Sequence, residues 1–183
     1  MRRRRLIVPG TAAALVLTAL VGGYQADAAP RGAVCQLAGK ATISPGLTTA
    51  AKTQRVTLSG VKLTGCREGS SASPGVPTAF SGTVTTTPNP VTTKASCASG
   101  NLALTATIAW STGTTTTATV KTTGLTASQT ISGKVATSTN PYLKKADLVE
   151  GEVAFKPTTT AQNCRVPVTA VTFSGALAAG APN

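Results

Sequence analysis

Hydrophobic and polar residues alternate along most of this chain, most clearly between Asn101 and Gly124. A period of two residues is typical of a half-buried β-strand. The alternation is interrupted at Ser111-Thr112-Gly113 and then resumes. A three-residue loop that ends in glycine is a favoured hairpin connection, because glycine adopts the left-handed backbone there without steric cost. The pattern predicts a hairpin in which Leu104 faces Val120, Ala106 faces Ala118, Ile108 faces Thr116 and Trp110 faces Thr114.

A short repeat of an apolar residue, a serine and a glycine marks four further strands. The copies are Leu58–Gly60, Phe80–Gly82, Ile131–Gly133 and Phe173–Gly175. In the last three copies the apolar face continues two residues beyond the glycine, so the glycine points inward. An inward glycine leaves room for a large facing side chain or a close backbone approach; a ligand groove is the alternative. In the first copy the apolar face moves to Val61, which predicts a β-bulge at Ser59-Gly60.

The whole mature chain follows this pattern, and no segment has the i, i+3, i+4 apolar spacing of an amphipathic helix. Strand-length runs, the first two at 34–43 and 55–65, are separated by Gly, Pro, Ser and Asn. Threonine, the commonest residue, is β-branched and favours pleated, half-exposed strands. Such a pattern is typical of an antiparallel sandwich or barrel. We predict an all-β fold, an antiparallel β-sandwich (Ig-like or related) of about 8–10 strands.

The first 28 residues have the three-part layout of a secretory signal peptide. Arg2–Arg5 form a positive region, Leu6–Val21 form an apolar run, and Ala26-Asp27-Ala28 matches an A-x-A cleavage signature. The run is shorter than the roughly 20 apolar residues of a transmembrane helix, and a Pro-Gly pair interrupts it. The arginines also fit a loose twin-arginine pattern, so two export routes stay open. We predict a cleaved signal peptide at residues 1–28, a single domain at 29–183 and no transmembrane anchor.

All four cysteines lie in the mature part of the chain, and an even number in an exported protein indicates two disulfides. Zinc is the competing interpretation, but the chain has no C-x₂-C pair and no histidine. Cys35 begins the first predicted strand and Cys66 follows the second, so the turn between these strands brings the two cysteines together. Cys97 and Cys164 each precede a long strand. We therefore predict the bridges Cys35–Cys66 and Cys97–Cys164.

The charge of the chain restricts its partners. Removal of the signal peptide lowers the formal net charge from +12 to about +9. The remaining cations are scattered, and only Lys144 and Lys145 are adjacent. Scattered positive charge favours weak attraction to polyanions and lacks the clustered, aromatic-interleaved pattern of a nucleic-acid reader. We expect weak association with anionic cell-envelope polymers, or an extracellular protein bound at an exposed sheet edge, and no nucleic acid.

The mature chain lacks most catalytic side chains. Without histidine there is no imidazole base and no Ser-His-Asp triad, and the disulfides consume every thiol. Glu150 and Glu152 share one strand face, where they could act as paired carboxylates or bind calcium with Asp147. Exposed acids on an edge strand are the simpler interpretation. We predict that the chain is not an enzyme and takes no cofactor or metal; a secreted hydrolase is the third function class.

Tyr142 is the best candidate for an exposed contact among the few aromatic residues. It follows Asn140-Pro141 and precedes two adjacent lysines, so a ring and two cations lie close together at a turn. We predict a binding site formed by Tyr142, Lys144 and Lys145. The alternative is a ring that caps the core at the turn.

Three segments carry a resemblance to a known group of proteins. They are Cys35–Thr48 (CQLAGKATISPGLT), Ala109–Gly113 (AWSTG) and Val171–Leu177 (VTFSGAL). They resemble small secreted proteins of actinobacteria that are rich in threonine and glycine and carry four cysteines. The resemblance covers most of the mature chain, and its motifs are structural. It implies a compact β fold and extracellular placement, and carries over no catalytic or binding residue. We expect a secreted, extracellular protein that can associate loosely with the cell surface. The expected function is a secreted, non-catalytic structural or binding module.

Overall fold

The computed structural model describes residues 32–68, 80–123, 128–158 and 164–181, and the predicted signal peptide lies outside these ranges. Within them, no helix has the length and apolar character needed to cross a membrane. The strands of the described part are β1 (Gly32–Leu47), β2 (Lys52–Glu68), β3 (Phe80–Thr87), β4 (Val91–Ala95), β5 (Asn101–Trp110), β6 (Thr115–Thr123), β7 (Ser128–Ser138), β8 (Leu148–Pro157) and β9 (Val168–Gly180).

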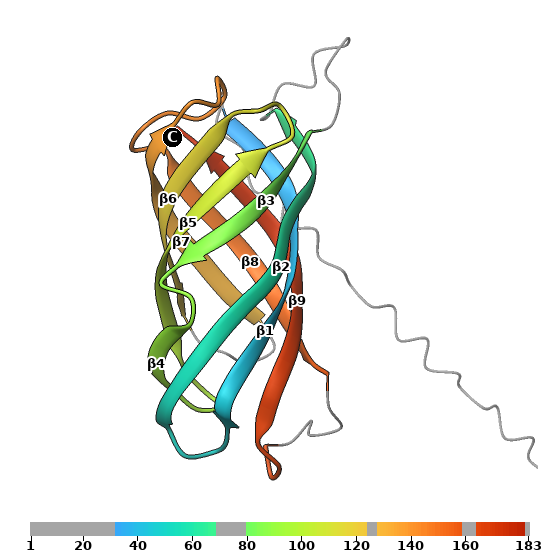
Figure 1. The fold of residues 1–183 in the computed structure, drawn as a ribbon, viewed down its shortest axis with the longest axis vertical. Coiled ribbons are helices and arrows are strands. Elements are labelled where there is room, and N and C mark those ends of the chain that lie inside the picture. Colours follow the sequence, from blue (N-terminus) through green and yellow to red (C-terminus); the bar gives the residue numbers. More distant parts are fainter. Residues whose placement is uncertain (1–31, 69–79, 124–127, 159–163, 182–183) are drawn as a thin grey trace, which may run out of the picture.

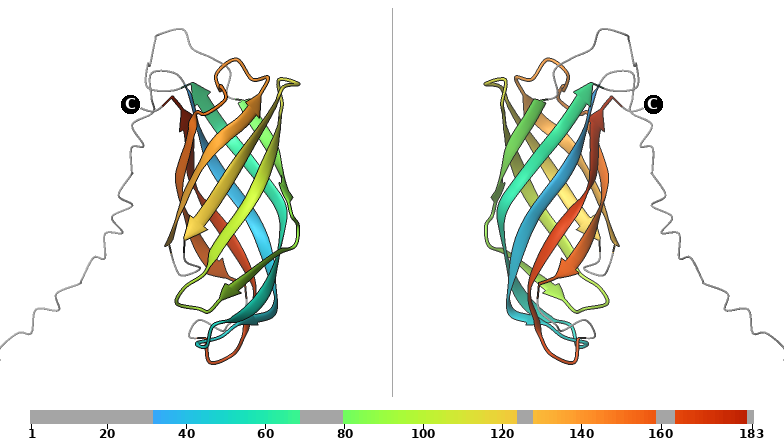
Figure 2. Two further views of the ribbon diagram at one scale, coloured as in Figure 1. Left: turned by 90° about the vertical axis from the view of Figure 1, so that its left-hand side faces the viewer. Right: turned by 90° about the vertical axis from the view of Figure 1, so that its right-hand side faces the viewer.

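These strands form a closed barrel. Every pairing is antiparallel, the order around the wall is β1-β9-β8-β7-β6-β5-β3-β2, and β2 pairs again with β1 (Figure 1). The ladder between the first and last strands runs from Gly32 opposite Gly180 to Leu47 opposite Val168. The strands cross the wall at a tilt, as both side views show (Figure 2). We call the end of the barrel with the β1–β2 turn the lower end and the opposite end the upper end, as in Figure 1.

The predicted all-β antiparallel fold is confirmed, but the predicted β-sandwich is wrong: the chain forms a closed eight-stranded barrel. Alternating strands fit both architectures, because each buries one face of every strand. The architectures differ in whether the first and last strands pair. Closure also corrects the interpretation of Glu150 and Glu152 as acids on an edge strand, because β8 lies between β7 and β9.

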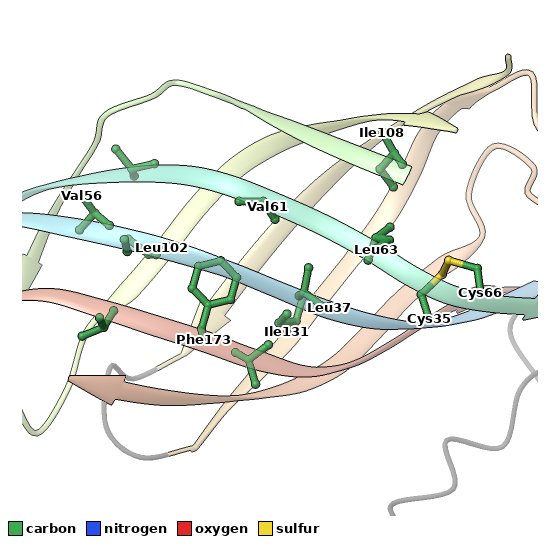
Figure 3. Packing of buried hydrophobic residues seen from close by; sticks show 14 of the residues in the cluster. Cys35, Leu37, Val56, Val61, Leu63, Cys66, Leu102, Ile108, Ile131 and Phe173 are labelled. Atoms are coloured by element: carbon green, nitrogen blue, oxygen red, sulfur yellow. A yellow bond between two sulfur atoms is a disulfide. The ribbon is translucent and has the colours of Figure 1, made fainter. Parts of the chain in front are cut away.

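The interior of the barrel is the hydrophobic core. Figure 3 shows part of it, with Leu37, Val61, Leu63, Ile108, Ile131 and Phe173 among the labelled side chains. Gly82 confirms the predicted inward glycines, because a Cβ there would lie 3.0 Å from the Trp110 ring and 2.7 Å from Ile108. At Gly133 and Gly175 a Cβ would instead meet a backbone carbonyl of the neighbouring strand. As predicted, the inward glycines make room for large side chains at Gly82 and allow a close approach of the neighbouring backbone at Gly133 and Gly175.

Two further local predictions are confirmed. Leu104, Ala106 and Ile108 face Val120, Ala118 and Thr116 across the β5–β6 hairpin, and the Trp110 N–H donates to the Thr114 carbonyl at 2.9 Å. Gly113 adopts the left-handed backbone, with φ +79°. The β1–β2 register shifts opposite Gly60, which has φ +58°, so the bulge lies where the apolar face changes sides.

Both predicted disulfides are also present. The bridge Cys35–Cys66 joins β1 to β2 at the upper end, with Cα atoms 4.1 Å apart (Figure 3). The bridge Cys97–Cys164 joins the β4–β5 connection to the residues before β9 at the lower end, with Cα atoms 6.3 Å apart. The two bridges therefore hold opposite ends of the barrel.

β3 and β4 behave as one interrupted strand along β2. β3 pairs with β2 at residues 62–66 and β4 pairs with it at residues 52–56, while residues 88–90 lie between the two ladders. The Asn89 side chain fills this gap. Its Oδ1 accepts the Leu58 backbone N–H at 3.0 Å and its Nδ2 donates to the Leu58 carbonyl at 2.9 Å. A side-chain amide has the donor and acceptor of a peptide group, so Asn89 completes the wall.

Gln54 plays the same part at the lower end. The β1–β9 register shifts between Thr42 and Leu47, and the Gly46 backbone in this stretch binds Gln54 instead. Gln54 Oε1 accepts the Gly46 N–H and Nε2 donates to the Gly46 carbonyl, both at 3.0 Å. Gln54 is 0% exposed, and its burial is tolerated because its amide is hydrogen-bonded.

Replacing Gln54 with leucine should lower the free energy of unfolding by roughly 2–4 kcal/mol, because it leaves the buried N–H and C=O of Gly46 without partners. Thr53→Val, at the exposed neighbouring position, is the matched control and should change stability by less than about 0.5 kcal/mol. Urea unfolding followed by the fluorescence of Trp110 measures both variants. Equal stability of the two would show that the Gln54 amide does not hold β1.

Replacing Cys97 and Cys164 together with alanine should cost about 4 kcal/mol, from the entropy of closing a long loop in the unfolded chain. The two cysteines are 67 positions apart in the sequence. Chemical unfolding of the double variant and the oxidised parent measures this difference. A loss below about 1 kcal/mol would contradict the stabilising role of the bridge.

Candidate functional site

The connection from β7 to β8, residues 139–147, lies at the upper end of the barrel and carries the three predicted binding residues (Figures 1 and 2). Leu143 at its centre is buried in the core, so the connection covers the upper mouth. Lys144 and Lys145 are exposed. The structure therefore places the two predicted cations side by side in solvent.

Tyr142 occupies a different environment from these lysines. Its side chain is half-buried, and its ring stacks on Phe80 with ring centroids 5.9 Å apart. Phe80 in turn contacts Trp110 edge to face at 5.3 Å. These three rings form an aromatic cluster at the upper mouth. Tyr142 thus contributes to packing, and a binding role for Tyr142, Lys144 and Lys145 stays a prediction.

A chain of hydrogen bonds ties this connection to the barrel wall. Trp110 Nε1 donates to Thr116 Oγ1 at 2.9 Å, and Thr116 Oγ1 lies 2.8 Å from Ser138 Oγ. Ser138 Oγ also accepts the Asn140 N–H at 3.1 Å, and Asn140 Oδ1 accepts the Tyr142 N–H at 2.9 Å. Thr116 and Asn140 are buried, and their polar groups are satisfied within this chain of hydrogen bonds. The chain thereby holds residues 139–147 in place over the upper end of the barrel.

The acidic residues of the 147–152 stretch serve separate purposes. The buried carboxylate of Asp147 accepts the Lys144 N–H at 2.6 Å and closes a turn. Glu152 accepts a hydrogen bond from Ser128 Oγ, and Glu150 is exposed. No group of three or more His, Cys, Asp and Glu side chains that could hold a metal occurs among the described residues. The structure therefore does not assemble the calcium site that was the alternative for these acids.

The outer surface of β1, β2 and β4 has a concentration of positive charge that the sequence pattern did not reveal. Six exposed cations lie on these adjacent strands: Lys40, Lys52, Arg55, Lys62, Arg67 and Lys94. Arg55 pairs with Thr92 and Lys94 with Thr53, so these two cations are diagonal neighbours across the β2–β4 ladder. The only acid on the three strands is Glu68, the last residue of β2. We call the six cations the basic face.

A cavity of about 120 Å³ lies inside the barrel. Aliphatic and aromatic side chains from all eight wall strands line it, and Leu143 lines it from the β7–β8 connection. Thr86 on β3 and Thr122 on β6 face the same space. The Oγ1 atoms of these two threonines are buried and have no hydrogen-bond partner among the described residues.

Strand parity is the signal that finds the two cavity threonines. Thr86 lies two residues after the inward Val84, and Thr122 lies two residues after the inward Val120. Threonine is common on the solvent side of strands, so composition alone places both residues outside. The basic face has no comparable local signal, because Lys40 and Lys94 lie on other strands and join the cations of β2 only through strand pairing.

No protein-family model, curated protein or solved structure matches this chain. Its resemblance to four-cysteine secreted proteins of actinobacteria stays an expectation. Function is therefore inferred from the basic face, the upper mouth and the cavity.

Replacing Thr116 with valine should lower the free energy of unfolding by roughly 1–3 kcal/mol, because the buried indole Nε1–H of Trp110 loses its acceptor. The same change should increase hydrogen exchange of the Asn140 and Tyr142 amides, which depend on the polar chain. Thr115→Val, one position away on the exposed face, is the control and should leave both quantities nearly unchanged. Unaltered stability and exchange in Thr116→Val would rule out this anchoring role.

Proposed function

We propose that this protein is a secreted, non-catalytic binding module whose basic face associates weakly with anionic polymers of the cell envelope. The supporting observation is the exposure of six cations on adjacent strands that carry a single acid, at the end of β2. An extended polymer with repeated phosphate or carboxylate groups can contact several of these cations at once. No reacting groups are needed for this role.

The expected affinity follows from the exposure of the cations. An ion pair at a protein surface contributes only about 0–1 kcal/mol, so a single contact would not retain the protein. Several contacts to one polymer add through their high effective concentration. Because the cations are exposed, salt screens the attraction strongly.

The disulfides support export, because structural disulfides are typical of oxidising compartments outside the cytosol. The predicted signal peptide and the resemblance to secreted proteins agree with such a location. The alternative, a protein partner bound at an open sheet edge, finds no such edge at the first and last strands, because β1 and β9 pair along their length. Among the described strands, the five-residue β4 pairs on one side only and is the one short edge left for it. A secreted hydrolase gains no support, since Glu152 is hydrogen-bonded to Ser128 and Asp147 closes a turn.

The first test is retention of the purified protein on an isolated cell-envelope fraction. We expect retention at low ionic strength and release at about 0.5 M salt, where electrostatic screening acts over only a few ångströms. Retention that is unchanged at this salt concentration would overturn the electrostatic proposal.

Three double variants that remove the same amount of charge locate the contact. Lys62→Gln/Lys94→Gln on the basic face should weaken binding to the envelope fraction roughly fivefold to tenfold, as expected for two exposed ion contacts. Lys121→Gln/Lys134→Gln, on β6 and β7, is the control and should weaken binding less than twofold. Lys144→Gln/Lys145→Gln tests the predicted upper turn. Equal weakening by the first two variants would mean that net charge alone acts and that the basic face is not the site.

A further inference from the structure

We propose that the cavity inside the barrel binds one small, uncharged molecule that combines an apolar ring or a short chain with a hydroxyl group. This site is separate from the basic face, because it lies on the inner side of the barrel wall. It rests on three observations: the size of the cavity, its apolar lining and the two buried threonine hydroxyls without partners.

The volume of the cavity sets the size of the ligand. An apolar cavity of about 150 Å³ in a protein interior stays free of water and accepts a single aromatic ring. The cavity here is slightly smaller, at about 120 Å³. Pockets for drug-sized ligands occupy about 300–1,000 Å³, so lipids and oligosaccharides do not fit. A ligand of one six-membered ring, or of similar bulk, does.

The lining of the cavity sets the charge of the ligand. All side chains that line it are apolar except those of three threonines, Thr86, Thr116 and Thr122. No charged side chain of the described residues borders the space, and transfer of an ion into such surroundings is strongly unfavourable. An anionic or cationic ligand is therefore excluded.

The hydroxyls of Thr86 and Thr122 favour a ligand that carries one polar group. Thr116 already binds Trp110 and Ser138, whereas Oγ1 of Thr86 and of Thr122 has no partner in the described part of the chain. A buried hydroxyl without a partner is destabilising. A water molecule needs two to four polar contacts to be held in a cavity, and this lining offers few. A ligand hydroxyl both donates and accepts, so it can bind one of these threonines while the rest of the ligand fills the apolar space.

Phenol and benzene are suitable probes, because they differ only by the hydroxyl. NMR titration of the purified, disulfide-bonded protein would follow the amides of cavity-lining residues such as Trp110. We expect the parent protein to bind both probes. In the double variant Thr86→Val/Thr122→Val, phenol affinity should fall at least tenfold, whereas benzene affinity should change less than threefold, because valine keeps the shape of threonine and removes its hydroxyl.

Two controls separate this result from unfolding. The double variant should be at least as stable as the parent, because it removes two buried hydroxyls without partners. Thr83→Val/Thr115→Val makes the same chemical change at two exposed positions and should leave both affinities unchanged. The proposal is overturned if the parent binds neither probe, or if the cavity variant fails to lose phenol selectively. Either result leaves the envelope association intact, because that depends on outer cations.

Discussion

The pairing of β1 with β9 is the interaction on which the rest of this structure depends. It joins strands from opposite ends of the described chain, with Lys40 opposite Thr172 near the middle of the ladder. Once the sheet is closed, every second residue of each strand lies inside a tube that is just wide enough for side chains. Large residues then require small ones opposite. The Phe173 ring lies over Gly39, for example, where a Cβ would collide with it.

Closure also explains why two side chains replace backbone hydrogen bonds where the strands are irregular. Where a strand of the wall is interrupted, the peptide groups of its neighbour lose their hydrogen-bond partners unless a side chain replaces the missing peptide. Asn89 does so between β3 and β4, and Gln54 does so at Gly46 of β1. The same closure separates two chemical environments. The inner side keeps an apolar cavity with two free hydroxyls, and the outer side of β1, β2 and β4 gathers cations.

Local features of the fold could be predicted from the sequence because they depend on neighbouring residues. The hairpin register follows from parity and Gly113, and the bulge at Gly60 follows from the change of apolar face at Val61. The closure of the barrel could not be predicted, because parity within each strand is the same in a sandwich and pairing of distant strands leaves no local signal. The role of Asn89 in completing the wall could not be predicted either, because Asn89 is part of a Thr-Pro-Asn-Pro segment, which is typical of a turn.

The candidate sites likewise contain residues whose neighbours could be predicted from the sequence and residues whose neighbours could not. Lys144 and Lys145 are adjacent in the sequence and are exposed together, whereas Tyr142 faces Phe80, a residue far away in the chain that sequence cannot place beside it. Strand parity assigns Thr86 and Thr122 to the inner face of the wall, but only after the strands are known to enclose an interior. In the basic face, Lys40 and Lys94 become neighbours of the β2 cations only through the β1–β2 and β2–β4 ladders.

Hydrogen exchange of the backbone amides of β1 tests the closed barrel most directly. Successive amides of a strand point to opposite neighbours, here β2 and β9. The closed barrel predicts slow exchange at consecutive positions from Gln36 to Thr42, because both neighbours are present. An open sheet would leave one side of β1 in water, so protected amides would alternate with amides that exchange as fast as those of an unfolded peptide. That alternating pattern would contradict closure.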